Sequence, residues 1–266
     1  MAPPGRRLLA QGLYGGVYLL ASGLTVYAMP ALAAPFGWRG AFVVTGAVFA
    51  GVWLIYALLA PPDAGLPSPG GLLPALRNRN ALILSCVHMA GFGLAMVVAT
   101  WAAVYLVHDY GLPLQAASLL GSLVLLGGIV WRPLGGVLVD RRVVGSRRLI
   151  RVSLAIALGA LGWLAAPSPG LAWGIAGLLL VGLATGLPYA AVFNGAAAAV
   201  PDSPASAQAL VGWAGAILVL AAPPLIGGLL EATDSFAAGY LTLALFVLAT
   251  LASTRWLDFP ERSNRL

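Results

Sequence analysis

The chain has 266 residues, of which 61% are hydrophobic and only 8% are charged, with a formal net charge of +6. Soluble domains carry about 25% charged residues, so this composition excludes a soluble globular protein. The positive charge lies beside apolar segments, where anionic headgroups attract it, and we therefore expect no nucleic acid as a partner.

Eight apolar segments follow one another along the chain, and each is long enough to be a membrane-spanning helix. Such a helix needs about 20 residues, and the segments lack the alternating pattern of a membrane barrel. The sequence therefore predicts an all-α membrane protein, a polytopic bundle of about eight transmembrane helices. The segments are 8–34, 40–60, 81–108, 114–138, 149–166, 171–200, 205–230 and 235–253.

The arginines give these segments an orientation. All 14 basic residues are arginines. Threading the segments back and forth places twelve of them on one side, Arg39 alone on the other, and Arg132 inside the fourth segment. Because cytoplasmic loops hold an excess of Lys and Arg, we expect both termini to be cytoplasmic, in a bacterial plasma (inner) membrane. A structure with Arg77 and Arg141 at opposite ends would contradict this threading.

A stretch rich in Pro and Gly divides the chain unevenly. Residues 61–80 open with Pro-Pro-Asp-Ala-Gly-Leu-Pro, which disfavours a helix, and we expect a cytoplasmic linker there. Two helices lie before it in 1–60, and a bundle of six follows in 81–254, with a cytoplasmic tail over 255–266. The arrangement is typical of one complete half and a two-helix remnant of another.

A loop motif follows the fourth segment. Four residues after Gly136 comes Asp140, and Arg141 stands next to it. Glycine lets helices approach closely, and a carboxylate at the membrane surface can accept from a helix N-terminus or pair with an arginine. These three residues predict a gating loop that joins two cytoplasmic helix ends.

This loop resembles the Gly-x-x-x-Asp-Arg-x-Gly-Arg-Arg signature of the major facilitator superfamily, in which Gly136, Asp140 and Arg141 match in place. The resemblance implies helices five to twelve of a twelve-helix transporter, truncated at its N-terminus. It also implies that a small solute, which could be an anion, is moved by alternating access. The family's antiporter signature and its Asn-Gly-Gly nitrate signatures are absent, so neither antiport nor nitrate specificity follows. The alternatives are a fragment without transport activity or, if the short chain is native, an oligomer.

Five side chains inside the segments are candidates for a substrate pathway. An ionisable group within a membrane is a functional candidate by default, so Arg132 either braces the gate or contacts an anionic substrate. The Asp and Glu residues all lie outside the segments, so His88 is either a packing residue or a proton carrier. The other three would line the cavity that the resemblance implies, although a helix–helix hydrogen bond could satisfy an amide. They are Trp101, Tyr189 and Asn194.

Functions other than transport find little support. Two histidines, a single cysteine and the lack of an intramembrane acid leave little from which to build a catalytic or metal centre. We therefore expect no enzyme, no metal and no cofactor, with a multi-pass membrane enzyme as the weaker alternative. The expected partners are a small-molecule substrate and the lipid bilayer. Residues 6–34 also imitate a signal peptide, although their apolar run exceeds the usual length of about 7–15 residues.

Overall fold

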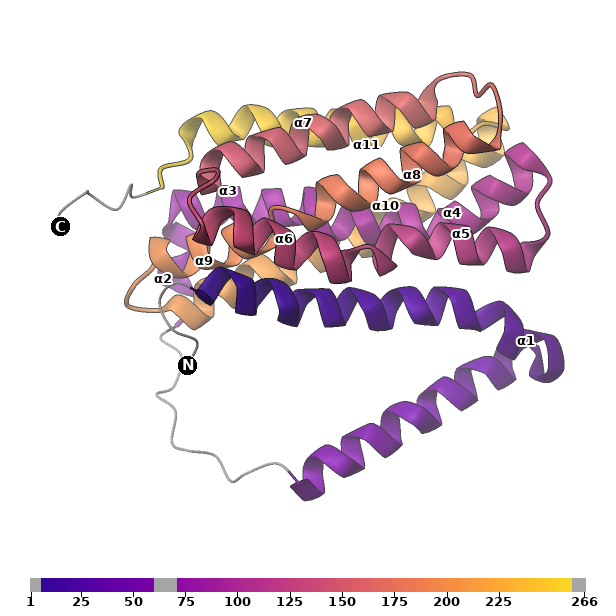
Figure 1. The fold of residues 1–266 in the computed structure, drawn as a ribbon, viewed down its shortest axis with the longest axis horizontal. Coiled ribbons are helices and arrows are strands. Elements are labelled where there is room, and N and C mark those ends of the chain that lie inside the picture. The colour runs from indigo at the N-terminus through magenta and orange to yellow at the C-terminus, as the bar shows by residue number, and fades with distance from the viewer. Residues whose placement is uncertain (1–5, 60–70, 260–266) are drawn as a thin grey trace.

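The computed structural model describes residues 6–59 and 71–259, and every regular element within these ranges is a helix (Figure 1). The all-α prediction is confirmed for this part of the chain. In order, the elements are α1 (Arg7–Leu59), α2 (Leu73–Arg77), α3 (Arg79–His88), the π-helical turn η2 (Met89–Gly93), α4 (Leu94–Tyr110), α5 (Leu114–Leu126), α6 (Gly128–Asp140), α7 (Ser146–Ala165), α8 (Leu171–Gly186), α9 (Tyr189–Ala199), α10 (Pro204–Thr233), α11 (Ala237–Ser253) and the 3₁₀ turn η3 (Thr254–Trp256).

Among the described residues, seven helical stretches are long and apolar enough to cross a membrane. The first of them, α1, is long enough to form two membrane-spanning helices. Its 53 residues would extend about 80 Å at 1.5 Å per residue, far beyond a hydrocarbon core of about 30 Å. Gly37 breaks it with a φ of 66°, which glycine adopts without strain, and the chain reverses there (Figure 1). The prediction of about eight transmembrane helices is thus confirmed.

The two arms of α1, residues 7–36 and 38–59, differ in how they pack. The first arm lies along α5 and α6, and its buried residues are mostly glycines, which let helix backbones approach closely. In the second arm only Ala41 is buried, whereas Phe49 and Trp53 are mostly exposed. The first arm is therefore part of the packed bundle, and the second presents an apolar surface suited to lipid.

The described arginines other than Arg39 and Arg132 lie at one end of the bundle, which we call the arginine-rich end. There α1 begins and α6 ends, and the main-chain nitrogen of Leu9 donates to Asp140 at 3.0 Å. The first residues of α7 lie there too, and so does the end of α11 (Figure 1). Arg77 ends α2 and Arg141 follows α6 at this same end. The threading of the segments thus agrees with the structure.

The 3₁₀ turn η3, which follows α11, is held at this end by a group that we call the arginine latch, formed by Arg79, Arg147 and Arg151. Their guanidinium groups donate to main-chain carbonyl oxygens at 2.7, 2.9 and 3.1 Å. The acceptors, in the same order, are Trp256, Arg255 and Thr254. The last carbonyl groups of a helix have no partner within it, so the latch supplies hydrogen bonds that the helix cannot make for itself.

The predicted linker and tail are only partly covered, because residues 60–70 and 260–266 lie outside the described ranges. Within the linker, 73–77 forms the short helix α2. Asn78 then caps α3 by accepting a hydrogen bond from the main-chain nitrogen of Ala81 at 3.0 Å. This cap starts α3 two residues before the predicted segment, since an Asn side chain at this position satisfies a free N–H of the first turn.

Candidate functional site

Arg132 lies within α6 and is only 1% exposed. Its Nη1 atom donates to the carbonyl oxygen of Gly15, on the first arm of α1, at 2.7 Å. Its Nε atom is buried and has no hydrogen-bond partner. Within the described ranges no carboxylate forms an ion pair with it. Buried charges are normally paired, so this guanidinium has both the charge and the open donor that an anion would use.

The ring of Tyr189 stacks on this guanidinium. The central carbon of the Arg132 guanidinium lies 3.9 Å from the ring centroid, within the range of a cation–π contact. Two glycines make room for this arrangement. A side chain at Gly15 would collide with the Tyr189 ring, and one at Gly135 would collide with the carbonyl group of Leu187, just before α9 begins. The site is thus built where three backbones approach closely.

His88 directly precedes the π turn η2, and its ring centroid lies 6.1 Å from that of Tyr189. Its ring stacks on Phe92 at 5.5 Å, with 10° between the planes, and meets Phe193 edge-on at 4.9 Å. It is 5% exposed, and no described residue makes a hydrogen bond to its ring nitrogens. The described contacts of His88 are therefore those of its ring with neighbouring rings.

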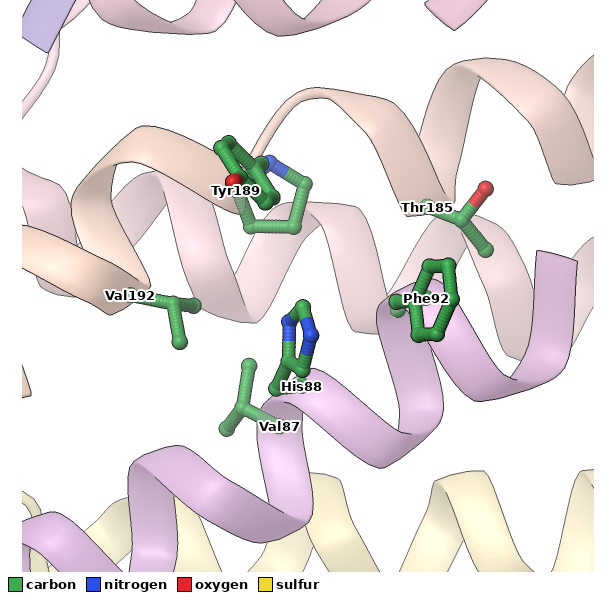
Figure 2. Close-up of a pocket in the computed structure, with 8 residues that line it drawn as sticks. Val87, His88, Phe92, Thr185, Tyr189 and Val192 are labelled. Atoms are coloured by element: carbon green, nitrogen blue, oxygen red, sulfur yellow. The ribbon is translucent and has the colours of Figure 1, made fainter. Parts of the chain in front are cut away.

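A small hollow opens beside His88 (Figure 2). Figure 2 shows the imidazole pointing into it, with Tyr189 across from the ring. About 180 Å³ of space lies between its lining atoms, a figure that includes open solvent at the mouth, and none of it has room for a water molecule in this conformation. The lining residues are Val87, His88, Gly91, Phe92, Thr185, Pro188, Tyr189 and Val192. A solute of any size could therefore enter here only after the lining residues move apart.

Gly136 and Asp140 of the predicted gating loop both meet the start of α1. Asp140 Oδ2 accepts the hydrogen bond from the Leu9 nitrogen at 3.0 Å. A side chain at Gly136 would collide with the Leu8 carbonyl group. The first N–H groups of a helix lack internal partners and carry partial positive charge, so the carboxylate clasps α1 to α6. The side chain of Arg141 is exposed and takes no part in the described contacts.

Replacing Asp140 with alanine is expected to loosen this clasp. A hydrogen bond to a charged group contributes about 1.5–3 kcal/mol, so the first turn of α1 should open more often. Hydrogen–deuterium exchange of the peptide containing Leu9 should accelerate by about tenfold or more, since each 1.4 kcal/mol is a factor of ten. Asp202→Ala, which removes an exposed carboxylate at the same end, is the control. Equal exchange in the two variants would show that the carboxylate does not hold α1.

Two predicted pathway residues lie away from this group. Trp101 is thirteen residues from His88, about 20 Å along a helix, and its ring packs edge-on against Phe236 at 6.1 Å. Asn194 donates to the carbonyl oxygen of Ala190, in its own helix, at 2.9 Å. The structure thus brings together Arg132, His88 and Tyr189 of the five candidates. The alternative expected for Asn194, a bond between helices, is replaced by a bond within one.

Sequence reasoning missed the other members of the site. Phe92 stands four residues after His88, so helical spacing could have paired them. The π turn between them has no such signal, although turns of this kind recur at functional sites. The Gly15 carbonyl could not have been singled out from a chain with 34 glycines. Its role depends on which helix it faces.

Comparison with known proteins places this site in a family context. A family model described as the Major Facilitator Superfamily matches residues 1–223. The chain is 28% identical to a probable nitrate/nitrite antiporter, NarK1, of Thermus thermophilus, over 74% of this chain and 46% of the relative. It is 27% identical to human monocarboxylate transporter 6, over 92% of this chain and 54% of the relative.

A solved structure shares the fold. The major facilitator transporter FucP, in its outward conformation, matches with a TM-score of 0.60 and 17% sequence identity. The match covers 86% of this chain and 58% of FucP. The chain therefore spans about half the length of the relatives and the structure that it matches.

Proposed function

The chain belongs to the Major Facilitator Superfamily, and we propose that it moves a small anion across the membrane by alternating access. The observation that supports the anion is the buried Arg132, whose Nε atom has no partner and which has no carboxylate partner among the described residues. A charge in the membrane interior is costly and marks a substrate pathway. An anion beside Arg132 would supply both the missing acceptor and the missing charge.

The names of the relatives agree with this charge. One is named for nitrate and nitrite and the other for monocarboxylates, and all of these are small anions. In our proposal the guanidinium binds the anion through its open donor, and Tyr189 holds the guanidinium plane in place. The residues beside His88 would face the far side of the anion once the site opens.

Access to Arg132 requires movement of α1. The side chain is 1% exposed and its Nη1 is engaged by Gly15, so an anion reaches it only when the first arm shifts along α6. The glycine-rich contact between these helices has few interlocking side chains and suits such sliding. In this proposal the Asp140 clasp keeps the arginine-rich end closed while the opposite end opens.

We also propose that the arginine-rich end faces the cytoplasm of a bacterial inner membrane. This orientation is supported by the excess of arginine at that end, which cytoplasmic loops show. Labelling of single cysteines introduced at residues 142 and 112, in a background without Cys86, would test it. A membrane-impermeant maleimide added to intact cells should label the cysteine at residue 112 only.

A pair of probes that differ only in charge tests the anion proposal. Lactate and lactamide have nearly the same shape, but only lactate carries a carboxylate. We expect lactate or nitrate to raise the thermal unfolding temperature of the purified chain, and lactamide to have no effect, because a ligand stabilises the state that it binds. The proposal would be overturned if lactamide stabilised the chain as much as lactate does. It would also be overturned if none of the three compounds stabilised the chain.

A further inference from the structure

The arginines around the turn η3 carry positive charge that no described carboxylate balances. Three of them form the arginine latch, and the fourth, Arg255, belongs to η3 itself. The ion pairs among the described residues are those of His108 with Asp109 and Asp234, and none of them includes an arginine. The main-chain oxygens that accept from the latch bear only partial charges, so they satisfy its donors without neutralising its cations.

The latch also brings its charges close together. Its acceptors are the carbonyl oxygens of three successive residues, Thr254, Arg255 and Trp256, in a turn that rises about 2 Å per residue. The Nε atom of Arg147 is buried and has no hydrogen-bond partner, so this guanidinium still lacks an acceptor. Like charges at such separations repel one another. An anion held beside η3 would relieve this repulsion.

The indole ring of Trp256 contacts two of these arginines. The central guanidinium carbons of Arg255 and Arg79 lie 3.7 and 5.9 Å from the ring centroid, within the range of cation–π contacts. Trp256 is nevertheless 47% exposed. Tryptophan is enriched at the boundary between membrane and water, where its ring lies at the level of the headgroups. The turn η3 therefore has the composition of a segment at headgroup depth.

An exposed apolar stripe leads from Arg255 back along α11. Its members recur every three or four residues, which places them on one face of the helix. They are Leu241, Leu245, Leu248 and Ala252. The eleven steps from 252 to 241 span about 16 Å at 1.5 Å per residue, or about half of a hydrocarbon core of about 30 Å. The stripe thus has the length of one lipid leaflet.

A second stripe runs along α7, which packs against α11 (Figure 1). It begins at the exposed Arg148 and continues at the same spacing through Val152, Ala155, Gly159 and Gly162. A Cβ at either glycine would meet nothing within 4 Å. No contact within the described ranges therefore accounts for two residues that weaken a helix. Without side chains, these positions leave a flat surface against which an acyl chain can lie.

We propose that an anionic phospholipid binds at this edge of the bundle, with its phosphate among Arg148, Arg255 and the arginine latch and its acyl chains along the two stripes. This inference does not depend on the proposed anion transport. Basic sites between helix ends at the membrane surface bind lipid headgroups, and the planar arginine fork matches the geometry of a phosphate. A headgroup with net negative charge is favoured, because a choline cation would face the same arginines.

Lipid binding measured by native mass spectrometry of the purified chain tests this proposal. Phosphatidylglycerol and phosphatidylcholine with identical acyl chains are the probes, since their headgroups differ in net charge. We expect the first phosphatidylglycerol to bind about tenfold or more tightly than the first phosphatidylcholine. The reason is that each arginine near the surface contributes about a factor of five to the binding of an anionic lipid.

Arg148→Gln/Arg255→Gln removes two exposed cations and leaves the hydrogen bonds of the latch in place, because Arg255 accepts through its main chain. This variant should prefer phosphatidylglycerol by about threefold or less. Arg6→Gln/Arg7→Gln is the matched control. It removes the same charge from exposed residues at the start of α1, which packs along α5 and α6, and should keep the full preference. Thermal unfolding checks that each variant folds, and Arg255→Gln alone replaces the double variant if needed.

Several results would overturn the proposal. Equal affinity for the two lipids would show that the charge of the headgroup is not recognised. A preference that survives in Arg148→Gln/Arg255→Gln, or that falls as far in Arg6→Gln/Arg7→Gln, would mean that no site at η3 is responsible. Free glycerol phosphate that binds as tightly as phosphatidylglycerol would identify a site for a soluble anion. A dimer that retains no lipid would mean that a second copy of the chain covers the stripes.

Discussion

Replacing Arg132 with glutamine is expected to weaken nitrate and lactate binding by about 30-fold or more. The reason is that removal of one partner from a buried, hydrogen-bonded charge pair costs about 2–5 kcal/mol, and each 1.4 kcal/mol is a factor of ten in affinity. Glutamine keeps a polar side chain but carries no charge. Titration calorimetry of the purified chain measures the loss.

Arg148→Gln is the control for this substitution. Arg148 is exposed on α7, so its loss changes the net charge by the same amount without touching the site. We expect its affinity to stay within about twofold of the unmodified chain. Arg132→Lys keeps the charge but loses the planar group that stacks on Tyr189, and its affinity should lie between the two. If Arg132→Gln binds as tightly as Arg148→Gln, the anion site lies elsewhere.

The same substitution separates a binding role from a structural one. An unpaired buried charge contributes little to stability, and replacing buried charges with neutral groups is often neutral or stabilising. We therefore expect Arg132→Gln without ligand to unfold at the same temperature as the unmodified chain or a higher one. A large fall in that temperature would mean that the guanidinium mainly braces the helices, which was the other reading of Arg132.

The second large effect is expected at Gly12, where the first arm of α1 touches α6. A Cβ at this position would lie 2.5 Å from the carbonyl oxygen of Arg132 and 2.8 Å from the Cα atom of Pro133. Both are backbone atoms and cannot rotate away. Gly12→Leu should therefore push the first arm off α6 and cost at least about 1–3 kcal/mol, the usual range for overpacking.

Gly51→Leu provides the matched control on the same element. Gly51 lies in the second arm of α1, and a Cβ there would meet nothing within 4 Å. The Gly51→Leu substitution adds the same leucine side chain to a surface that is already apolar. Thermal unfolding should show a clear loss for Gly12→Leu and little change for Gly51→Leu, and lactate should no longer stabilise the Gly12 variant. Equal unfolding temperatures would mean that the first arm is not held against α6.

The helices and their order were accessible from the sequence because both depend on one-dimensional signals. Apolar length identifies a membrane helix, and arginine counts sort the ends, so Arg77 and Arg141 were placed correctly. The stretch between the predicted segments 8–34 and 40–60 proved to be helical on both sides of Gly37. A single residue with a positive φ is enough to reverse the chain there, and no pattern of hydrophobicity records that.

The site was accessible only in part, for a physical reason. Arg132 stands out because a charge within an apolar segment is visible in the sequence. Its partners depend on which helix faces which, and this is decided by close backbone approaches such as that at Gly15. Trp101 shows the limit of the approach. It shares a spanning segment with His88, yet its depth places it among different aromatic rings.

The arginine latch has a consequence for the order in which the protein can be completed. Its donors are made before its acceptors, with 177 residues separating Arg79 from Trp256. During synthesis, the starts of α3 and α7 thus lack these hydrogen bonds until η3 has been made. The turn η3 fastens the arginine-rich end, so a chain that stops before Thr254 would leave the three arginines of the latch without these acceptors.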